Sequence, residues 1–449
     1  AGRQFGGISI DSRTVRPGDL FVAVVGDRSD GHRFVRDALD AGAIGALVQR
    51  GVPLGGKAHG LVEVDDTRAA LLDLARAARS GLTATVVGIT GSTGKTCTKD
   101  LTAAVLRQRF SVVASPASFN NEVGLPLTIL QAADDTEVIV CEMGSRGPGH
   151  IRLLCEVARP HIGVVTNVGV AHMELFGSPD ILRASKRELP ESLPHDGVAI
   201  LNGDDPVVKE YASHTDAKPL FFGLSNDADV KAERIAVSRE TGRATFHVLT
   251  PSGSASVTLP VPGEHMVPNA LAAAAVGSAL GVTAEETAKG VTRAEISGGR
   301  MDVFKAPDGV TVIDDSYNAN PTSVAAALKA ARWMAGDGRC IAVLGTMAEL
   351  GPISVEEHGR VGELLVRLGI DVLVTVGEEA RVIAAEAERE GLESQHIFPC
   401  DHVDEAVTLV RRLVRAGDLV LVKASRAAGL ERLAEAFRSG QTAAKASTP

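Results

Sequence analysis

Short, mainly apolar runs that lead into polar or small residues recur along most of the chain. Runs at 20–24, 86–89, 137–141, 162–166 and 340–344 have the length and composition of buried strands. Helical spacing of apolar residues follows most of them. Strands that alternate with helices predict an α/β fold with parallel sheets, in which functional groups gather at the carboxyl ends of the strands.

Changes in this pattern divide the chain into three predicted domains. Residues 1–82 form a small α/β domain, 83–297 a central domain with a P-loop-type parallel sheet, and 298–449 a Rossmann-like domain without a G-x-G-x-x-G fingerprint. Between 232 and 259 the pattern becomes short alternating strands with glycine turns, which predicts an antiparallel extension of the central sheet. The length of 449 residues suits about three domains.

The loop after the run at 86–89 carries the clearest chemistry. Glycines there let the backbone approach phosphates, and N–H groups at the start of the following helix supply positive charge. Lys95 would reach the terminal phosphates and Thr96 would hold Mg²⁺, which predicts a nucleoside triphosphate site. The glycine spacing is not that of a standard P-loop, and a ligand-free turn is the alternative. The predicted loop comprises Thr90, Gly91, Ser92, Thr93, Gly94, Lys95 and Thr96.

Polar residues follow other predicted strands of the central domain. Glu142 ends a buried strand beside the phosphate loop, where a Mg²⁺ ligand belongs, although it could be a surface residue. His172 could ligate a metal or polarise a phosphate, but a lone histidine after a strand is more often a hydrogen-bonded structural residue. The polar loop 114–126 is long enough to be functional, and Asn120 and Asn121 are its candidate substrate contacts. By helical periodicity alone, Lys186 is a solvated residue.

Polar residues gather at the end of the strand predicted at 311–315 and directly after it. Asp315 could accept hydrogen bonds from a ribose or an ammonium group, and Tyr317 lies close to it. Asn318 and Asn320 can each donate and accept hydrogen bonds. A simple turn is the alternative explanation for this cluster.

Four further residues are candidates, and three of them have two explanations each. Asn269 could be the N-cap of an alanine-rich helix or bind an adenine edge. Ser12 and Arg13 could hold a phosphate or form a solvated turn. Arg300 lies in a glycine-rich hinge, where two domains could meet.

The composition of the chain argues against some classes of ligand and favours one cellular compartment. The net charge of −10 argues against nucleic acid as the main ligand. The five scattered cysteines include no C-x-x-C pair, which favours reduced thiols in a cytoplasmic protein over a disulfide framework or a zinc site. No apolar run approaches the roughly 20 residues of a membrane helix. Aromatic residues make up only 3%, so we expect cores of Ala, Val, Leu and Ile.

Several stretches together resemble the Mur ligases, over nearly the whole chain. They are 88–96 (GITGSTGKT), 142–144 (EMG), 166–172 (TNVGVAH), 184–188 (ASKRE), 315–321 (DSYNANP) and 345–351 (GTMAELG). Residues 11–13, 17–21 and 30–32 are similar to the N-terminal domain of the family. The stretches 317–321 (YNANP) and 347–351 (MAELG) particularly resemble the member that acts last in the pathway.

The resemblance implies an amide ligase in the final cytoplasmic step of peptidoglycan precursor synthesis. ATP would phosphorylate the terminal carboxylate of UDP-MurNAc-tripeptide, and the amine of D-Ala-D-Ala would attack the acyl phosphate. The two substrates and Mg-ATP would lie between domains that close around them, and we expect a monomer.

The resemblance also implies roles for individual residues. At the phosphates and the first Mg²⁺ it implies Lys95 and Thr96, with Glu142 at Mg²⁺ and Arg300 at the phosphates. It implies His172 at a second metal and Lys186 as a carbamylated lysine. At the nucleoside it implies Asn269 beside adenine, and Asp315 and Tyr317 near the ribose. The substrate positions it implies are Asn318 and Asn320 at the dipeptide, and Ser12 and Arg13 at the uridine diphosphate.

The chain departs from the family at two places. Many members have an acidic residue where Thr346 stands, and most carry a further strand–helix segment before the position of Ala1. The alternatives are therefore a ligase for a different amino acid or peptide, and a P-loop ATPase that serves as a binding or regulatory module.

Overall fold

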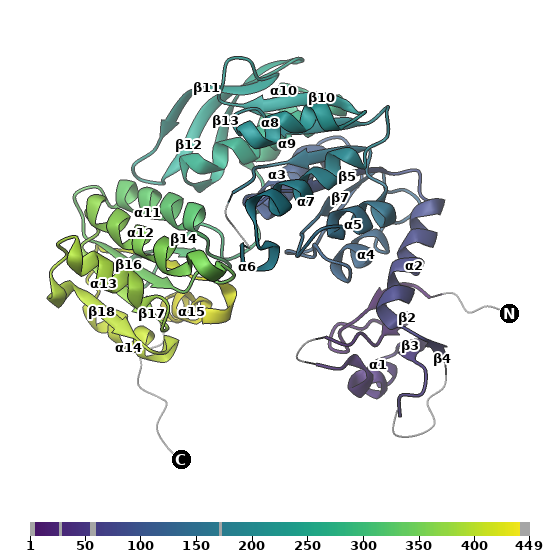
Figure 1. Cartoon of the computed structure of the whole chain (residues 1–449), viewed down its shortest axis with the longest axis horizontal. Coiled ribbons are helices and arrows are strands. Elements are labelled where there is room, and N and C mark those ends of the chain that lie inside the picture. Colours follow the sequence, from purple (N-terminus) through teal and green to yellow (C-terminus); the bar gives the residue numbers. More distant parts are fainter. Residues whose placement is uncertain (1–4, 27–28, 54–59, 170–172, 441–449) are drawn as a thin grey trace.

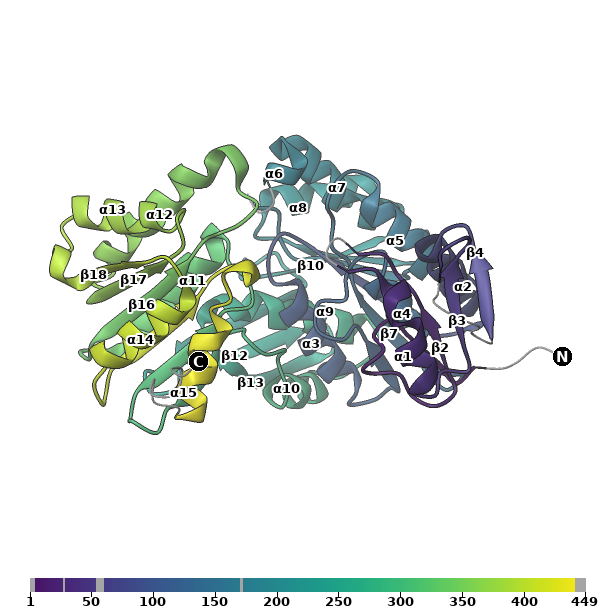
Figure 2. The same cartoon turned by 90° about the horizontal axis from the view of Figure 1, so that it is seen from below.

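The computed structural model of the protein describes residues 5–26, 29–53, 60–169 and 173–440 (Figure 1). The strands lie in three separate sheets, of four, nine and six strands. The first and third sheets, with their helices, lie on either side of the central one in two perpendicular views (Figures 1 and 2). We call these parts the first, central and third units. The α/β class predicted from the sequence is confirmed.

The first unit has a parallel sheet with short helices. Its strands, in spatial order, are β1 (Gly7–Ser9), β2 (Asp19–Val22), β3 (Gly45–Gln49) and β4 (Leu61–Val64). Its helices are η1 (Gly31–Phe34), α1 (Val35–Asp40) and the longer α2 (Thr67–Gly81). Asp66 caps α2 by accepting from the N–H groups of Arg68 and Ala69. Leu71 of α2 packs in a core with β2 and β3, whereas Ala75 packs in a core of the central unit, so α2 joins the two units.

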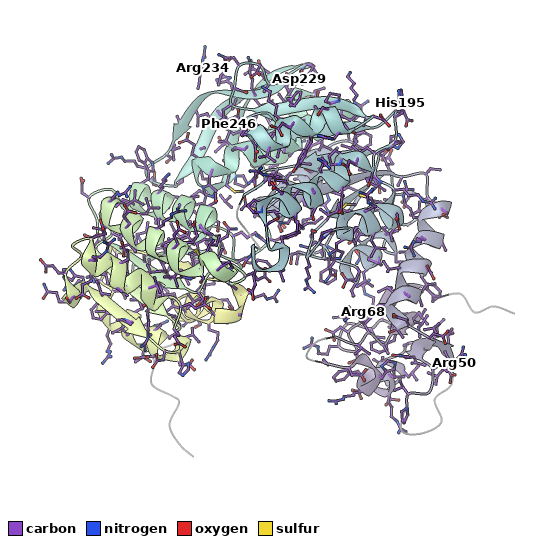
Figure 3. All side chains as sticks on the ribbon, in the orientation of Figure 1. Arg50, Arg68, His195, Asp229, Arg234 and Phe246 are labelled. Carbon is purple, nitrogen blue, oxygen red and sulfur yellow. The ribbon has the colours of Figure 1, made fainter. Side chains whose placement is uncertain are left out.

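The central sheet has the order β13-β12-β11-β10-β9-β8-β5-β7-β6. Its parallel strands are β5 (Thr85–Thr90), β6 (Val112–Ala114), β7 (Val138–Glu142), β8 (Ile162–Val165), β9 (Val198–Asn202), β10 (Lys218–Gly223) and β11 (Val230–Val237). The strands β12 (Arg243–Thr250) and β13 (Gly253–Pro262) run antiparallel to their neighbours. The antiparallel extension predicted at 232–259 is therefore confirmed. Arg234 has a φ of 54° where the β11–β12 register shifts, at the outer end of this extension (Figure 3).

Helices cover both faces of the central sheet because alternate strand residues point to opposite sides. Val87 and Ile89 pack with α3 (Lys95–Leu106), α9 (Val267–Ala279) and α10 (Ala284–Thr292). Val86 and Ile139 pack with α4 (Gly124–Ile129), α5 (His150–Ala158) and α7 (Pro179–Glu191). The short helices α6 (Met173–Phe176), α8 (Pro206–Glu210) and η2 (Tyr211–His214) complete this unit before β10, and η3 (Glu264–Met266) precedes α9.

The third unit repeats this layered arrangement. Its strands, in spatial order, are β14 (Asp302–Lys305), β15 (Thr311–Asp315), β19 (Leu419–Lys423), β16 (Cys340–Gly345), β17 (Val372–Val376) and β18 (Ile397–Cys400). One face packs on α11 (Pro321–Ala335), α12 (Ser354–Arg367) and α13 (Arg381–Arg389), and the other on α14 (Val403–Leu413) and α15 (Glu431–Ser439). The 3-10 turns η4 (Gly351–Ile353), η5 (Ser394–His396) and η6 (Arg426–Ala428) lie in its connections.

Packing agrees with the low aromatic content. Residues 270–275 of α9 are alanine except for Leu271, and all are buried against the central sheet.

The five cysteines are buried and unpaired, and burial raises the thiol pKa of Cys97 and Cys141 to about 12. Within the described ranges, no helix is both long and apolar enough to cross a membrane.

Candidate active site

The carboxyl ends of the central and third sheets meet at one cavity of about 670 Å³. Its walls contain the phosphate loop and polar residues from both units. Among the residues predicted from the sequence, the lining includes Ser92, Thr93, Gly94, Lys95, Thr96, Asn120, Asn121, Glu142, Lys186, Asn269, Arg300, Asp315, Tyr317, Asn318 and Asn320. Groups separated by more than 200 positions in the chain are thus brought to one place.

The phosphate loop depends on two glycines with positive φ. Gly91 has a φ of 146°, and a Cβ there would lie 1.9 Å from Thr166 Oγ1. Gly94 has a φ of 78° and is the N-cap of α3, and a Cβ there would lie 2.4 Å from Asn269 Oδ1. Both positions therefore require glycine. The N–H of Thr93 donates to Asn167 Oδ1 at 2.9 Å, which ties the loop to the end of β8.

Lys95 lies over the loop that carries it. Its Nζ donates to the carbonyl oxygens of Gly91 at 2.8 Å and Ser92 at 3.1 Å. Removal from bulk water lowers its pKa; Glu142 opposes this shift and the positive charge of Arg300 adds to it. The ammonium group thus lies at the loop, where a phosphate can replace the carbonyl contacts.

Thr96 and Glu142 form an oxygen-rich pair at the strand ends. Thr96 Oγ1 donates to Glu142 Oε2 at 2.8 Å, and Asn120 Nδ2 donates to Oε1 of the same carboxylate at 2.8 Å. Glu142 is only 1% exposed, so the alternative of a surface glutamate is wrong. Hydroxyl and carboxylate oxygens are the donors that Mg²⁺ prefers, and the residues present fit that ion. Within the described residues, no cluster of three or more His, Cys, Asp or Glu side chains forms a complete protein cage for a metal.

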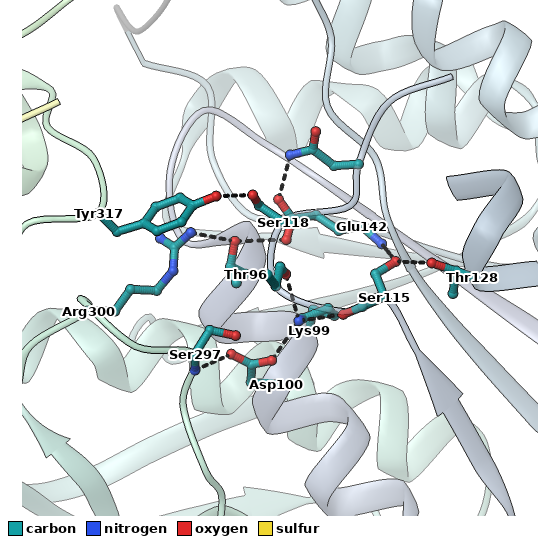
Figure 4. Close-up of polar contacts among 12 residues, drawn as sticks. Thr96, Lys99, Asp100, Ser115, Ser118, Thr128, Glu142, Ser297, Arg300 and Tyr317 are labelled. Carbon is teal, nitrogen blue, oxygen red and sulfur yellow. Dashed lines mark hydrogen bonds and ion pairs between the residues drawn. The ribbon is translucent and has the colours of Figure 1, made fainter. Parts of the chain in front are cut away.

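Arg300 of the third unit reaches into the central unit at this pair (Figure 4). Its Nη2 donates to Thr96 Oγ1 at 2.9 Å, and its guanidinium lies 4.2 Å from the centre of the Tyr317 ring. The Tyr317 hydroxyl is hydrogen-bonded to Ser118 Oγ in the polar loop of the central unit. The two contacts hold the third unit against the phosphate loop.

Lys99 and Asp100 fix the surroundings of this contact (Figure 4). Lys99 is 2% exposed and its Nζ donates to the carbonyl oxygens of Ser115 and Ala117, which holds the polar loop. Asp100 Oδ2 accepts from the N–H of Ser297 in the hinge at 2.9 Å. Neither residue was predicted from the sequence to have a role, because a charged residue in a helix is ordinarily solvated.

Asp315 is paired inside the protein. Its Oδ2 accepts from Lys423 Nζ at 2.5 Å, and its Oδ1 accepts from the N–H of Met301 at 3.1 Å. Lys423 also donates to the carbonyl of Asn318 at 2.9 Å. Lys423 received no role from the sequence, although its place at the end of a strand, next to Ser425 and Arg426, was a usable signal.

The solvent exposure of Lys186 differs from the exposure predicted from helical periodicity. The expectation of a solvated residue is wrong, because Lys186 is 1% exposed in α7. Its Nζ lies 5.7 Å from the centre of the Phe176 ring. Burial, and then the charge of Lys95, lower its pKa well below the ordinary lysine value, with Glu188 opposing. Periodicity failed here because helix α7 packs on two sides.

The asparagines of the cavity have different local roles. Asn269 lies inside α9, whose N-cap is Met266, so the N-cap explanation is wrong. Asn269 instead faces the loop at Gly94. Asn320 is the N-cap of α11, in a capping box with Ser323, and Asn121 Oδ1 accepts from the N–H of Gly124 at the start of α4. All three still line the cavity.

Two of the predicted substrate contacts lie away from the cavity. Ser12 and Arg13 lie in a turn of the first unit, where Arg13 donates to Asp11 at 2.6 Å and its side chain is 86% exposed. Neither residue lines the cavity. His172 lies outside the described residues.

Family models match all three units. The Mur ligase family catalytic domain matches residues 4–79, the Mur ligase middle domain 89–277, and the Mur ligase glutamate ligase domain 299–426. The UDP-N-acetylmuramoyl-tripeptide–D-alanyl-D-alanine ligase of Mycobacterium tuberculosis is 42% identical, over 98% of this chain and 93% of the relative. The chain belongs to the Mur ligase family.

Solved structures of the family have the same fold as this chain. A MurF crystal structure from Acinetobacter baumannii aligns with a TM-score of 0.83 and 32% identity, over 96% of this chain and 92% of that one. The MurF ligase of Thermotoga maritima in complex with ADP aligns with a TM-score of 0.81 and 31% identity, over 97% of this chain and 98% of that one. The similarity therefore extends over all three units of this Mur ligase.

Proposed function

We propose that this Mur ligase joins D-alanyl-D-alanine to UDP-MurNAc-tripeptide and converts ATP to ADP and phosphate. The near full-length similarity to relatives named for this activity carries the proposal. The cavity supports it, because a phosphate loop and a cation from another unit meet where two anionic substrates would have to react.

The phosphate loop is the ATP site of the proposal. Residues 92–96 of the loop, with the first turn of α3, line the cavity, and Lys95 adds a positive charge. Arg300 would move from Thr96 to the terminal phosphates. Asn269, beside Gly94, would bind adenine, and Asp315 and Tyr317 would lie near the ribose.

Thr96 and Glu142 would hold Mg²⁺, with His172 and Lys186 at a second ion. A bound Mg²⁺ neutralises phosphate charge and so assists transfer of the γ-phosphoryl group. The hydroxyl and carboxylate oxygens of this pair, with phosphate oxygens completing the set, match the way proteins bind Mg²⁺.

We further propose that Lys186 is carbamylated. A buried lysine with a strongly lowered pKa presents a neutral amine. The amine nitrogen forms a bond to the carbon of CO₂ and loses one proton, which converts a potential cation into an anionic group with two oxygens. The carbamate would relieve the repulsion between Lys186 and Lys95.

The reaction would proceed in two transfers. A carboxylate oxygen of the tripeptide attacks the γ-phosphorus of ATP, and ADP leaves. The dipeptide amine then attacks the acyl carbon, and the tetrahedral intermediate expels phosphate and forms the amide. Lys95 and Arg300 would stabilise charge on the transferring phosphoryl group.

The domain division at 82/83 and 297/298 is part of this proposal. The first domain would bind the uridine diphosphate, with Ser12 and Arg13 near it, and the third would bind the dipeptide, with Asn318 and Asn320 near it. Asn120 and Asn121 would contact the tripeptide. Because the substrates are cytoplasmic nucleotides, we propose a cytoplasmic enzyme.

ADP release tests the proposal. ATP and UDP-MurNAc-tripeptide are incubated with D-Ala-D-Ala, with L-Ala-L-Ala, or with neither, and ADP is measured. We expect rapid release only with the D,D-dipeptide. A product should form whose mass equals that of UDP-MurNAc-tripeptide plus D-Ala-D-Ala minus water. Equal ADP release with and without the dipeptide would contradict the function.

A further inference from the structure

The cationic side chains that line the cavity differ in whether they have a carboxylate partner or a hydrogen-bond acceptor in the protein. They are Lys95, Arg146, Lys186, Arg300, Lys423 and Arg426. On the third unit, Lys423 is paired with Asp315 and Arg300 donates to Thr96. Within the described ranges of the chain, the Arg426 guanidinium has neither a carboxylate partner nor a hydrogen-bond acceptor. An exposed cation at a cavity wall is thus available on this unit.

Arg426 is held against an aromatic ring. It lies three residues after the end of β19, at the first position of η6, and its guanidinium carbon lies 5.4 Å from the centre of the Tyr317 ring. Contact with the ring occupies a face of the planar guanidinium and leaves its N–H edges free. Those edges can bind a carboxylate through two parallel hydrogen bonds.

The backbone that carries Arg426 is fixed by its neighbour. The N–H of Ser425 donates to the carbonyl of Thr346 at 3.0 Å, and its Oγ accepts from the N–H of Ala348 at 2.9 Å. The same hydroxyl contacts the carbonyl of Ala319 at 3.3 Å. The loops after β15 and β16 are therefore tied to the segment that presents Arg426, which preorganises its position.

The spacing of charges favours the dipeptide as the ligand. The guanidinium carbons of Arg300 and Arg426 both lie within 5.4 Å of the Tyr317 ring centre, and Arg300 reaches the phosphate loop at Thr96. A dipeptide spans about 7 Å. Its amine can therefore lie at the phosphate side of Tyr317 while its carboxylate lies at Arg426.

We propose that Arg426 binds the C-terminal carboxylate of the incoming dipeptide and so selects an acceptor amine of this length. The inference rests on the proposed function. The carboxylate of the tripeptide is a poorer occupant, because it must lie at the phosphate loop of the central unit to be phosphorylated.

The test compares D-Ala-D-Ala with D-alanyl-D-alaninamide, which has the same shape and a neutral end. The kcat/KM for each acceptor is measured in the wild type and in Arg426→Ala, Arg426→Lys, Arg146→Ala and Arg432→Ala. Arg432 is the matched surface control, since its guanidinium pairs with Asp404 outside the cavity. The KM for ATP and the melting temperature report on integrity.

We expect the wild type to prefer the acid over the amide by about 10- to 100-fold, the effect of a charged hydrogen-bonded pair. Arg426→Ala loses this preference through a higher KM for the acid, Arg426→Lys keeps part of it, and Arg432→Ala keeps it fully. An unchanged preference in Arg426→Ala, or its loss in Arg146→Ala instead, would overturn the inference. Absence of dipeptide-dependent ADP release in the wild type would overturn the proposed function itself.

Discussion

Single side chains in the cavity form hydrogen bonds with one another and with the loop backbone. Lys95 donates to loop carbonyls, and Thr96 joins Glu142 and Arg300 through hydrogen bonds. A nucleotide with its metal has to exchange these contacts for its own. Binding energy therefore depends on groups that are already in position, as expected for a preorganised site.

The hydroxyl of Thr96 can be removed with little change in shape. We expect Thr96→Val to lower kcat/KM for ATP by about 10- to 100-fold, because a buried carboxylate then loses its donor and the metal loses an oxygen. Steady-state ADP release measures this. Thr102→Val, in the same helix, is the matched control, since the buried Thr102 hydroxyl has no hydrogen-bond partner among the described residues. Equal activity of Thr96→Val and the wild type would argue against its role.

The lowered pKa of Lys186 should make the free energy of unfolding depend on pH. Its folded-state pKa lies well below the ordinary value of 10.5, so the unfolded chain binds more protons between the two values. In CO₂-depleted buffer at pH 7 we expect Lys186→Met to be more stable than the wild type by about 1–3 kcal/mol. The difference should shrink as pH rises towards 10.5, where both states become neutral.

Urea denaturation of Lys186→Met and the wild type at several pH values measures the free energies of unfolding. A difference that stays constant with pH would show that Lys186 has an ordinary pKa in the folded protein. Lys209→Met, at an exposed surface ion pair with Asp227, is the control for the substitution itself.

At the scale of elements, the site is built from turns at strand ends. The turn from β5 to α3 is the most restrictive, because Gly94 combines a positive φ with close contact to Asn269. A side chain there strains the backbone and displaces Asn269 at once. Its effect should therefore appear in both stability and nucleotide affinity.

We expect Gly94→Ala to lower the free energy of unfolding by about 1–3 kcal/mol and to weaken ATP binding. Gly81→Ala is the control, since it lies at the end of α2 with no atom within 4 Å of an added Cβ. It should be neutral or slightly stabilising. Chemical denaturation and nucleotide titration measure both quantities. Equal behaviour of the two variants would contradict the described conformation of the loop.

The sequence predicted the elements better than the surroundings of their side chains. The strands that carry Glu142 and Asp315 were predictable, because buried apolar runs have a characteristic length. Lys186 was misplaced, since periodicity within one helix does not show how many neighbours pack on it. Lys423 and Arg426 received no role from the sequence. The ion pair of Lys423 with Asp315 and the contact of Arg426 with the Tyr317 ring join segments that are far apart in the chain.

At the scale of the whole molecule, the central and third units touch at several separate points. Besides Arg300 and Tyr317, the N–H of Glu174 in α6 donates to the carbonyl of Glu349 at 3.1 Å. Farther from the cavity, the guanidinium of Arg239 lies 5.1 Å from the ring of Trp333 in α11. These contacts join the phosphate loop to the unit that presents Arg426, so both transfers of the proposed reaction can take place at one cavity.

The central claim is that a carboxylate is activated by phosphorylation and then joined to a dipeptide. Labelling the terminal carboxylate of the UDP-MurNAc-tripeptide with ¹⁸O tests it most directly, with mass spectrometry of the phosphate and of the peptide product. We predict that each turnover with ATP and D-Ala-D-Ala transfers one ¹⁸O atom into inorganic phosphate and leaves the other in the new amide. Phosphate free of ¹⁸O, while the amide product still forms, would contradict the account.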